Sequence, residues 1–216
     1  MRHILISGAN RGIGLGLAQA YAKAGHTVTG IARKPPEETS EVTWLKADVT
    51  NLADLRNAAE RTGELDLLVC NAGVYLDRGL DHFATNGDEW ANSFAVNVEG
   101  VFRTIQAYRN KLKKGAKIAI ISSQMGSSER AGGGSYIYRA SKAAVANLGA
   151  NLAVDLKEEG IAVGMFHPGW VQTDMGTDAA AINVETSING LMARFQDLTL
   201  DKTGCFENYD GTHMPF

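Results

Sequence analysis

Cysteine is scarce in this chain: Cys70 and Cys205 are its two thiols among 216 residues. Two cysteines are too few for a disulfide framework, and their spacing matches no metal-ligand motif. The five histidines are scattered along the chain, so they offer no zinc-ligand spacing either. These features predict a cytoplasmic protein with reduced thiols and without a bound metal.

Long apolar runs are also lacking. No segment approaches the about 18 unbroken apolar residues of a membrane-spanning helix, and the amino-terminal "MRHILISGAN" has no apolar core or cleavage site of a signal peptide. Lys and Arg number 21 against 24 Asp and Glu, a formal net charge of -3, so no excess of positive charge indicates nucleic-acid binding. These absences favour a small-molecule partner over a membrane or a nucleic acid.

What the chain does contain is a regular alternation of short β-branched runs and longer amphipathic stretches. Continuously apolar strands that alternate with helices predict a parallel sheet covered on both faces. We therefore expect one doubly wound α/β domain over residues 1–216, with about seven strands. The charged, Pro-rich residues 33–41 fit a surface loop better than a domain boundary. The expected strands are 3–7, 26–32, 41–45, 65–70, 116–122, 161–166 and 204–209, and the expected helices include 12–25, 51–63, 97–115 and 136–160.

A glycine-rich turn, "SGANRGIG", follows the first expected strand and opens the first expected helix. Glycines at Gly8, Gly12 and Gly14 let the backbone approach a pyrophosphate closely, and a helix amino terminus offers unpaired N–H groups. The spacing is G-x-x-x-G-x-G, which differs from the usual G-x-G-x-x-G dinucleotide fingerprint. Its position between a strand and a helix nevertheless predicts a nucleotide site.

Cofactor selectivity is expected from the end of the second strand. An acidic residue there would bind a ribose 2′-hydroxyl, whereas a basic residue would accept a 2′-phosphate. Arg33 and Lys34 occupy this position, and Arg11 adds a cation in the glycine turn, so NADPH is favoured over NADH. The alternative is that Arg33 and Lys34 are merely solvated. Asp48 after the third strand could accept from the adenine amino group or cap the helix that starts near Asn51.

The stretch "YRASK" places Tyr138 and Lys142 four residues apart on an expected helix. Residues at i and i+4 lie on the same side of a helix, so the phenol and the ammonium can approach each other. A nearby cation favours the phenolate and lowers the pKa of a tyrosine from its usual value of about 10. The alternative is an exposed lysine beside a half-buried tyrosine.

Six motifs occur in a fixed order: the glycine turn, "CNAG" at 70–73, "VNVEG" at 96–100, "ISS" at 121–123, "YRASK" at 138–142 and "HPGWVQTDM" at 167–175. With this ordered set the chain resembles the short-chain dehydrogenase/reductase family over nearly its whole length. The details resemble the sniffer and C-factor branch of carbonyl reductases.

The resemblance implies a role for each of four catalytic residues. Tyr138 would be the general acid, and Lys142 would lower its pKa and bond the nicotinamide ribose. Ser123 would hold the substrate carbonyl, and Asn97 would fix a water that relays protons. Asn97 could instead simply bond backbone within a helix. The family serine usually lies about thirteen residues before the tyrosine, whereas Ser123 lies fifteen before it, which leaves Ser122 as a possible substitute.

The resemblance also implies a set of cofactor contacts. Asn71, Ala72 and Gly73 would lie along the cofactor, and Thr173 would reach the nicotinamide carboxamide, although Thr173 and Asp174 could instead form a helix cap. The expected NADP(H)-binding residues are Gly8, Asn10, Arg11, Gly12, Ile13, Gly14, Arg33, Asp48, Val49, Asn71, Ala72, Gly73, Tyr138, Lys142, Pro168, Gly169, Val171 and Thr173.

The implied function is NADPH-dependent oxidoreduction of a small-molecule aldehyde, ketone or alcohol. A lid around residues 170–190 is short, which predicts an open pocket edged by Trp170, Met175 and Met125, although Trp170 could instead be core. Relatives often pair the helix that carries Tyr138, so a homodimer is a further hypothesis. A different class of function is a dinucleotide-binding signalling or regulatory protein of C-factor type with little turnover. A serine hydrolase is disfavoured because no G-x-S-x-G elbow occurs.

Overall fold

The sheet of this protein contains seven parallel strands in the order β3-β2-β1-β4-β5-β6-β7. The structure is a computed structural model that describes residues 1–36, 41–81, 83–85, 87–177 and 179–216, so residues 37–40 of the expected surface loop lie outside the described residues. All seven expected strands form. Their bounds are β1 His3–Ser7, β2 Thr27–Ala32, β3 Thr43–Lys46, β4 Leu65–Cys70, β5 Leu112–Ile121, β6 Ala162–His167 and β7 Phe206–Asn208.

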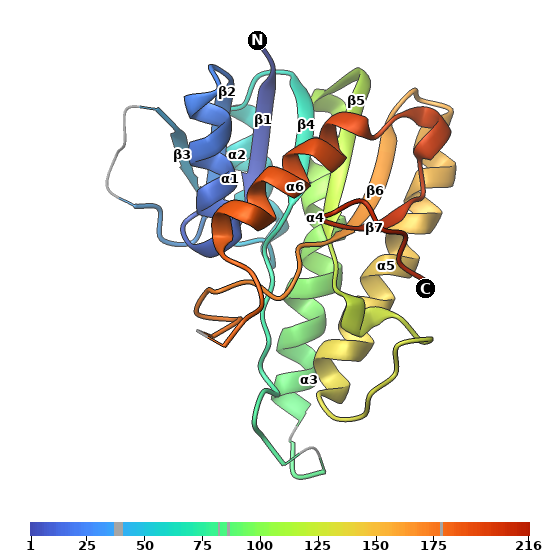
Figure 1. Ribbon diagram of the computed structural model, residues 1–216. Helices are drawn as coiled ribbons and strands as arrows, with labels where there is room; N and C mark the ends of the chain where they lie inside the picture. The colour runs from blue at the N-terminus through green and yellow to red at the C-terminus, as the bar shows by residue number, and fades with distance from the viewer. Residues whose placement is uncertain (37–40, 82, 86, 178) are drawn as a thin grey trace.

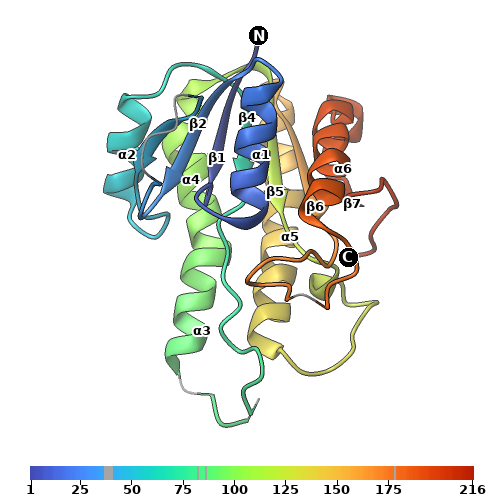
Figure 2. The ribbon, with the colours of Figure 1, turned by 60° about the vertical axis from the view of Figure 1, so that its left-hand side comes forward.

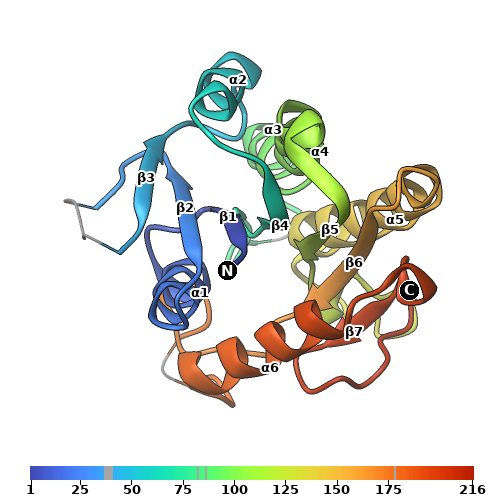
Figure 3. The ribbon, with the colours of Figure 1, turned by 90° about the horizontal axis from the view of Figure 1, so that it is seen from above.

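Helices cover both faces of the sheet, as predicted for a doubly wound fold. In Figures 1 and 3, α1 and α6 lie on one face, while α2, α4 and α5 lie on the other. The α-helices are α1 Gly12–Lys23, α2 Leu52–Glu60, α3 Gly87–Phe94, α4 Gly100–Tyr108, α5 Tyr136–Lys157 and α6 Val184–Asp197. No described helix is long and apolar enough to cross a membrane.

Alternating side chains of the strands build two separate cores. In β1, Leu5 packs with α2, α4 and α5, whereas its neighbours Ile4 and Ile6 pack with α1 and α6. Leu68 and Val69 of β4 divide in the same way. Because successive side chains of a strand point to opposite faces, apolar residues at every position are required when both faces are covered.

The middle of the chain differs from the sequence-based expectation. The helix expected over 97–115 begins earlier, at Gly87, and runs through α3, the five-residue π-helix Ala95–Glu99 and α4. It ends at Tyr108, and β5 already begins at Leu112, where Leu112 pairs with Leu65 before the register shifts. Helical periodicity across 109–115 was therefore misleading, because Lys113 and Lys114 are polar positions at the solvent-facing start of a strand. Helix α6 was not predicted.

The strand order reverses between β1 and β4, which is where the fold opens a crevice. The chain leaves β1 toward one face to form α1 and leaves β4 toward the other face to form α3. Ligands of open α/β sheets bind in such a crevice outside the carboxyl ends of the strands. Four of the predicted motifs lie at the ends of β1, β4, β5 and β6 at this edge, whereas "VNVEG" and "YRASK" lie within the helices that come after β4 and β5.

Candidate active site

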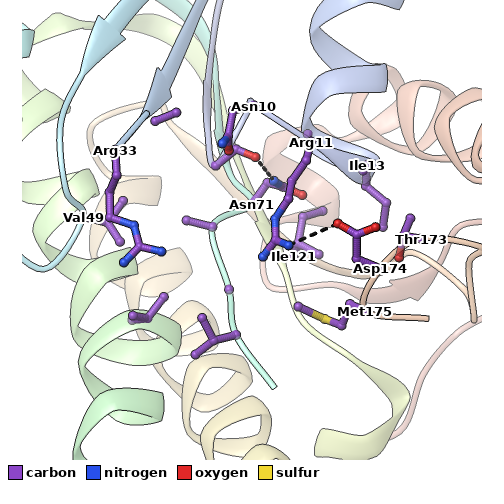
Figure 4. A pocket seen from close by; sticks show the side chains of 18 of the residues that line it. Asn10, Arg11, Ile13, Arg33, Val49, Asn71, Ile121, Thr173, Asp174 and Met175 are labelled. Carbon is purple, nitrogen blue, oxygen red and sulfur yellow. Dashed lines mark hydrogen bonds and ion pairs between the residues drawn. The ribbon is translucent and has the colours of Figure 1, made fainter. Parts of the chain in front are cut away.

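A groove of about 1340 Å³ lies at the carboxyl edge of the sheet. It collects residues from the carboxyl ends of six strands, β1 to β6, and from α5, and Figure 4 shows many of their side chains converging on it. Most of the predicted cofactor residues line it. These are Gly8, Asn10, Arg11, Gly12, Ile13, Gly14, Arg33, Asp48, Val49, Asn71, Ala72, Gly73, Tyr138, Lys142, Pro168 and Thr173.

The glycine turn is shaped by close backbone contacts. Gly8 has a φ of +64°, and a Cβ there would lie 2.8 Å from the Cα of Ala72 on the neighbouring segment. The Asn71 side-chain amide donates to the carbonyls of Ser7 and Gly8 at 3.0 and 3.1 Å. Helix α1 then begins at Gly12 without a side-chain cap from Arg11. The turn therefore presents uncapped N–H groups at a helix amino terminus, which fits the pyrophosphate of a dinucleotide.

The cations expected to bind the 2′-phosphate lie at two separate places in the groove. Arg33 and Lys34 line the groove after β2. Arg11 extends toward the 170s segment, where its Nη1 pairs with Asp174 Oδ2 at 3.2 Å (Figure 4). Both side chains of this pair are mostly exposed, so the pair contributes at most about 1 kcal/mol. The guanidinium of Arg11 is thus oriented toward Asp174 and away from Arg33.

Asp48 lines the groove and does not cap helix α2. Its Oδ1 accepts hydrogen bonds from the backbone N–H and the hydroxyl of Thr50 at 2.9 and 2.8 Å. Asn51 caps α2 by accepting from Ala53 and Asp54. The alternative that Asp48 is the helix cap is therefore wrong.

Tyr138 and Lys142 are both buried at the inner end of the groove, so the interpretation of an exposed lysine is also wrong. The ammonium lies 5.7 Å from the centroid of the Tyr138 ring and donates to the carbonyl of Ile121 at 3.0 Å. Burial lowers the pKa of Lys142 to about 8. Burial also raises the pKa of Tyr138 to about 12, against the lowering effect of a hydrogen bond with Ser123. The pKa of Tyr138 is therefore raised overall, contrary to the expectation of a lowered pKa, because desolvation of the phenolate dominates.

Ser123 reaches Tyr138 despite its unusual offset along the chain. It caps the 3-10 turn Gln124–Gly126, with its Oγ accepting from the N–H of Met125 at 3.1 Å, and it lies close enough to Tyr138 to lower the pKa of the phenol. Ser122 points the other way and donates to the carbonyl of Lys142 at 3.0 Å. The geometry thus favours Ser123 over Ser122 as the partner of Tyr138.

A buried hydroxyl, phenol and ammonium at the end of a nucleotide-sized groove is an arrangement for proton transfer beside a bound cofactor. A profile of the family described as short chain dehydrogenase matches residues 2–183 of the sequence. The chain belongs to the short-chain dehydrogenase family.

Individual members of the short-chain dehydrogenase family resemble this chain closely. The carbonyl reductase Sniffer of D. melanogaster superposes with a TM-score of 0.93 at 29% identity over 100% of both chains. An NADPH-bound carbonyl reductase from chicken fatty liver gives a TM-score of 0.90 at 26% identity over 100% of this chain and 99% of its own. The protein named C-signal of Myxococcus xanthus is 36% identical over 162 residues, 72% of this chain and 95% of that protein. The resemblance to the sniffer and C-factor branch is confirmed.

Asn97, the remaining catalytic residue implied by the family, lies in the π-helix and is fully buried. Its Oδ1 accepts from the N–H of Val74 at 2.8 Å, and its Nδ2 donates to the carbonyl of Val74 and to Ser141 Oγ, both at 2.9 Å. The side chain therefore fixes the backbone just after "CNAG". Asn97 lies in a helix and bonds backbone, as the structural alternative predicted, but the backbone it bonds belongs to the separate segment at Val74. Asn97 and Ser123 do not line the groove.

The segment after β6 forms a turn over the groove. Thr173 accepts from the N–H of Gly176 at 3.1 Å, and no helix begins at Thr173 or Asp174, so the alternative of a helix cap there is wrong. Asn183 caps α6 instead. Two predicted cofactor residues, Gly169 and Val171, do not line the groove, and Val171 is buried in a bridge with Ile182. Residue 178 of the expected lid lies outside the described residues.

Several groove residues were not predicted from the sequence. Val74 and Leu76 follow "CNAG", and Asn92, Ala95 and Val96 precede or begin "VNVEG", so proximity to these motifs was the available signal. Leu76 and Met175 are exposed apolar side chains at the groove, and Trp170 is half-exposed rather than core. Met125 does not line the groove. In the part of the chain that the structure describes, no group of three or more His, Cys, Asp or Glu could hold a metal ion.

Proposed function

We propose that this protein is an NADP(H)-dependent oxidoreductase that reduces the carbonyl group of a small aldehyde or ketone. The observation that carries the proposal is the buried Tyr138 and Lys142 pair in a groove that also bears Arg33 and Lys34, with the buried Ser123 beside Tyr138. The similar carbonyl reductase from chicken fatty liver binds NADPH, which supports the choice of cofactor.

Different residues of the groove would bind different parts of the cofactor. The glycine turn and the amino terminus of α1 would hold the pyrophosphate, and Arg33 with Lys34 would accept the 2′-phosphate. Asp48 would accept from the adenine amino group, and Thr173 would contact the carboxamide. When bound, NADPH supplies the hydride.

The buried set would manage the proton. Tyr138 is protonated at neutral pH because burial raises its pKa to about 12, so it can donate to the carbonyl oxygen of the substrate. Lys142 would stabilise the tyrosinate that remains. Burial disfavours the charged ammonium, which is why the pKa of Lys142 is lowered. Ser123 would donate to the same carbonyl oxygen and stabilise the developing charge. Asn97 would support a proton relay to solvent.

The substrate end of the groove supports an open pocket for carbonyl compounds of varied shape. Met175 and Leu76 present exposed apolar surface there, and Trp170 lies over the 170s turn with its Nε1 donating to the carbonyl of Gly176 at 2.7 Å. Apolar rims favour apolar substituents on the substrate without specifying their shape. Tight binding of a single acidic compound, with no turnover of neutral carbonyls, would contradict this proposal.

The test is oxidation of NADPH and of NADH by the purified protein, with a panel of aldehydes, ketones and α-diketones. We expect turnover with NADPH, and its loss in Tyr138→Phe with the affinity for NADPH retained. The matched control is Tyr209→Phe, which changes a tyrosine at the end of β7, outside the groove. Measurable NADPH binding without turnover of any carbonyl would overturn the proposal of an enzyme.

A second candidate is a dinucleotide-binding regulator, which the likeness to C-signal favours. A regulator would need the glycine turn and Arg33, but it would not need a buried phenol that is hydrogen-bonded to Ser123. The same Tyr138→Phe variant distinguishes the two, because a regulator would keep its biological effect. The complete proton-transfer set supports the enzyme.

Location and assembly are further parts of the proposal. Both cysteines are free, which supports a reducing compartment such as the cytoplasm. Helices α3, α4 and α5 share a shallow apolar hollow of about 400 Å³ that includes Phe102 and Leu148. We expect a homodimer that covers this face.

A further inference from the structure

Helix α5 carries the proton donor in its first turn, and that turn has an unusual amino terminus. The residue before the helix, Ser135, has a left-handed backbone with a φ of 48°, and its side chain makes no capping hydrogen bond. Tyr138 is the third residue of the helix, so its N–H is one of those that have no partner within the helix. Buried N–H groups of this kind need an acceptor from elsewhere.

Asp77 supplies that acceptor from a distant part of the chain. Its carboxylate is 1% exposed, and it accepts from the N–H of Ile137 at 2.9 Å and from the N–H of Tyr138 at 3.2 Å. Asp77 lies 61 residues before Tyr138 in the sequence, in the connection between β4 and α3. Figure 2 shows this connection running down between α3 and the first turns of α5. A buried carboxylate therefore fixes the backbone of the catalytic tyrosine.

Tyr75, two residues earlier in the same connection, holds the ring of Tyr138. The two rings are stacked with centroids 4.2 Å apart and planes 17° from parallel. The Tyr75 hydroxyl also forms a hydrogen bond with the hydroxyl of Ser135. The side chain of Ser135 is thereby engaged with Tyr75, which is consistent with Asp77 acting as the cap in its place.

Residues 74–78 of this connection are held at both ends. Asn97 bonds both backbone groups of Val74, as described above. Arg78 lies over the ring of Tyr75, 6.0 Å from its centroid, and donates to the carbonyl of Met175 at 2.6 Å. Residues 74–78 thus link the cofactor segment after β4, the first turn of α5 and the turn over the groove.

We propose that Asp77 is a positioning residue for the proton donor, with Tyr75 as its partner: Asp77 fixes the backbone of Tyr138 and Tyr75 fixes its ring. This inference rests on the proposed function for its kinetic consequence. Small displacements of a catalytic group are costly, since a misplacement of about 1 Å can lower a rate about 100-fold. A helix end that loses its cap frays, so without Asp77 the phenol would lose its fixed position.

The test compares Asp77→Ala with Asp77→Asn. Asp77→Asn keeps one acceptor oxygen, and at the place of Oδ2 it would lie 2.9 Å from the nitrogen of Ile137 and 3.4 Å from that of Tyr138, so this variant should stay within about threefold of the wild-type kcat. Asp77→Ala leaves both N–H groups unpaired and should lower kcat about tenfold or more, with Kd for NADPH within about threefold. Asp81→Ala is the matched control, because Asp81 caps an exposed turn of the same connection by accepting from Phe83 at 3.1 Å.

A second readout does not depend on turnover. With ¹³C-labelled tyrosine, the ring resonance of Tyr138 is assigned by its absence in Tyr138→Phe and followed up to about pH 10.5, near the usual tyrosine pKa. The groups that face Tyr138 are Lys142 on its own helix, Tyr75, and Ser123 after β5. In the wild-type protein the resonance should not titrate, because burial raises the pKa of Tyr138 to about 12. In Asp77→Ala water reaches the frayed turn, and the resonance should begin to move.

The outcomes are separable from those of the proposed function. If the wild-type protein reduces no carbonyl compound, the proposed function fails, while the Tyr138 resonance still tests the positioning role. Wild-type kcat and a wild-type titration in Asp77→Ala would overturn the inference, as would equal losses in Asp77→Ala and Asp77→Asn. If circular dichroism shows that Asp77→Ala does not fold, Tyr75→Leu replaces it: kcat should fall while Tyr75→Phe, which keeps the stacked ring, remains active. Full activity in Tyr75→Leu would then reject the inference.

Discussion

At the scale of single residues, the chemistry of this site depends on how burial treats its two ionisable groups. Burial disfavours charge, so the pKa of Tyr138 rises to about 12 and the pKa of Lys142 falls to about 8. The phenol is therefore fully protonated and the ammonium mostly charged at neutral pH. This combination suits carbonyl reduction, which consumes a proton from the phenol and leaves a negative charge beside the cation.

The pH dependence of reduction should follow Lys142. Below about pH 8 the ammonium is charged and stabilises the tyrosinate, so kcat should be flat; above its pKa of about 8 the lysine becomes neutral and kcat should fall. The measurement is kcat for reduction of a good substrate between about pH 6 and pH 10. Lys142→Met should have a low kcat without this alkaline limb. Lys117→Met is the control, because burial also lowers the pKa of Lys117 but its ammonium donates to Phe195 and Gln196 carbonyls away from the groove.

Arg33 should decide between the two cofactors. Its side chain lines the end of the groove after β2, and a charge-assisted hydrogen bond to a phosphate contributes about 1.5–3 kcal/mol. Arg33→Ala should therefore weaken NADPH binding about tenfold or more and leave NADH binding nearly unchanged. Calorimetric titration with each cofactor measures this. Arg61→Ala, which removes a cation at the end of α2 outside the groove, should alter neither affinity.

Single residues were predictable where chemistry restricts the choice. Tyr138, Lys142, Arg33 and the glycine turn stand out in the sequence because spacing, charge or the lack of a side chain identifies them. Asp77 does not, since an aspartate in a loop has no pattern that reveals which distant helix it caps.

At the scale of elements, the contact between the 3-10 turn Gln124–Gly126 and α5 determines how Ser123 meets Tyr138. Gly126 packs so closely on α5 that a Cβ there would lie 2.6 Å from the backbone carbonyl carbon of Lys142. Neither backbone segment can move without displacing Ser123 or Lys142, two of the residues proposed to be catalytic. The absence of a side chain at Gly126 therefore lets this turn dock on the helix that carries Tyr138, close to Ser123.

Gly126→Ala should disturb both stability and catalysis. Overpacking of this kind costs about 1–3 kcal/mol, so the free energy of unfolding should fall by that amount and kcat should fall as Ser123 and Lys142 separate. Chemical denaturation and steady-state kinetics measure the two effects. Gly87→Ala is the matched control at the start of α3, where a Cβ would meet nothing within 4 Å. Its unfolding free energy should stay within about 0.5 kcal/mol of the wild type, and a loss as large as that of Gly126→Ala would contradict the packing argument.

Elements were predictable where periodicity was unambiguous. All seven strands and the helix that carries Tyr138 follow from their apolar patterns. The boundary between α4 and β5 could not be predicted from such a pattern, because the mostly charged residues 109–114 suit an exposed helix end and the exposed start of a strand equally well. The π-helix at 95–99 was also unpredictable, since its extra residue per turn is selected by packing of Asn97 against Val74 rather than by local propensity.

At the scale of the whole molecule, the fold follows from the alternation of strands and helices together with the right-handed crossovers that parallel strands require. The groove then arises at the edge where the strand order reverses, and each motif lies either at the end of a strand or in the helix that comes after it. What the sequence could not predict is how connections pack across that edge, such as residues 74–78 against α5, because those contacts depend on the assembled sheet.

The apolar hollow between α3, α4 and α5 allows the proposed assembly to be tested. Phe102 is 43% exposed beside Leu148, an arrangement that a homodimer would cover and a monomer would leave in water. We expect light scattering at micromolar concentration to give the dimer mass, and Phe102→Glu to give a folded monomer, because a charge buried in an apolar interface lacks a partner. Leu200→Glu is the control, since it places the same charge at a similarly exposed leucine of the 3-10 turn Leu200–Lys202 and should remain dimeric. A monomeric mass for the unmodified protein would reject the dimer, and this face would then be an exposed surface of a functional monomer.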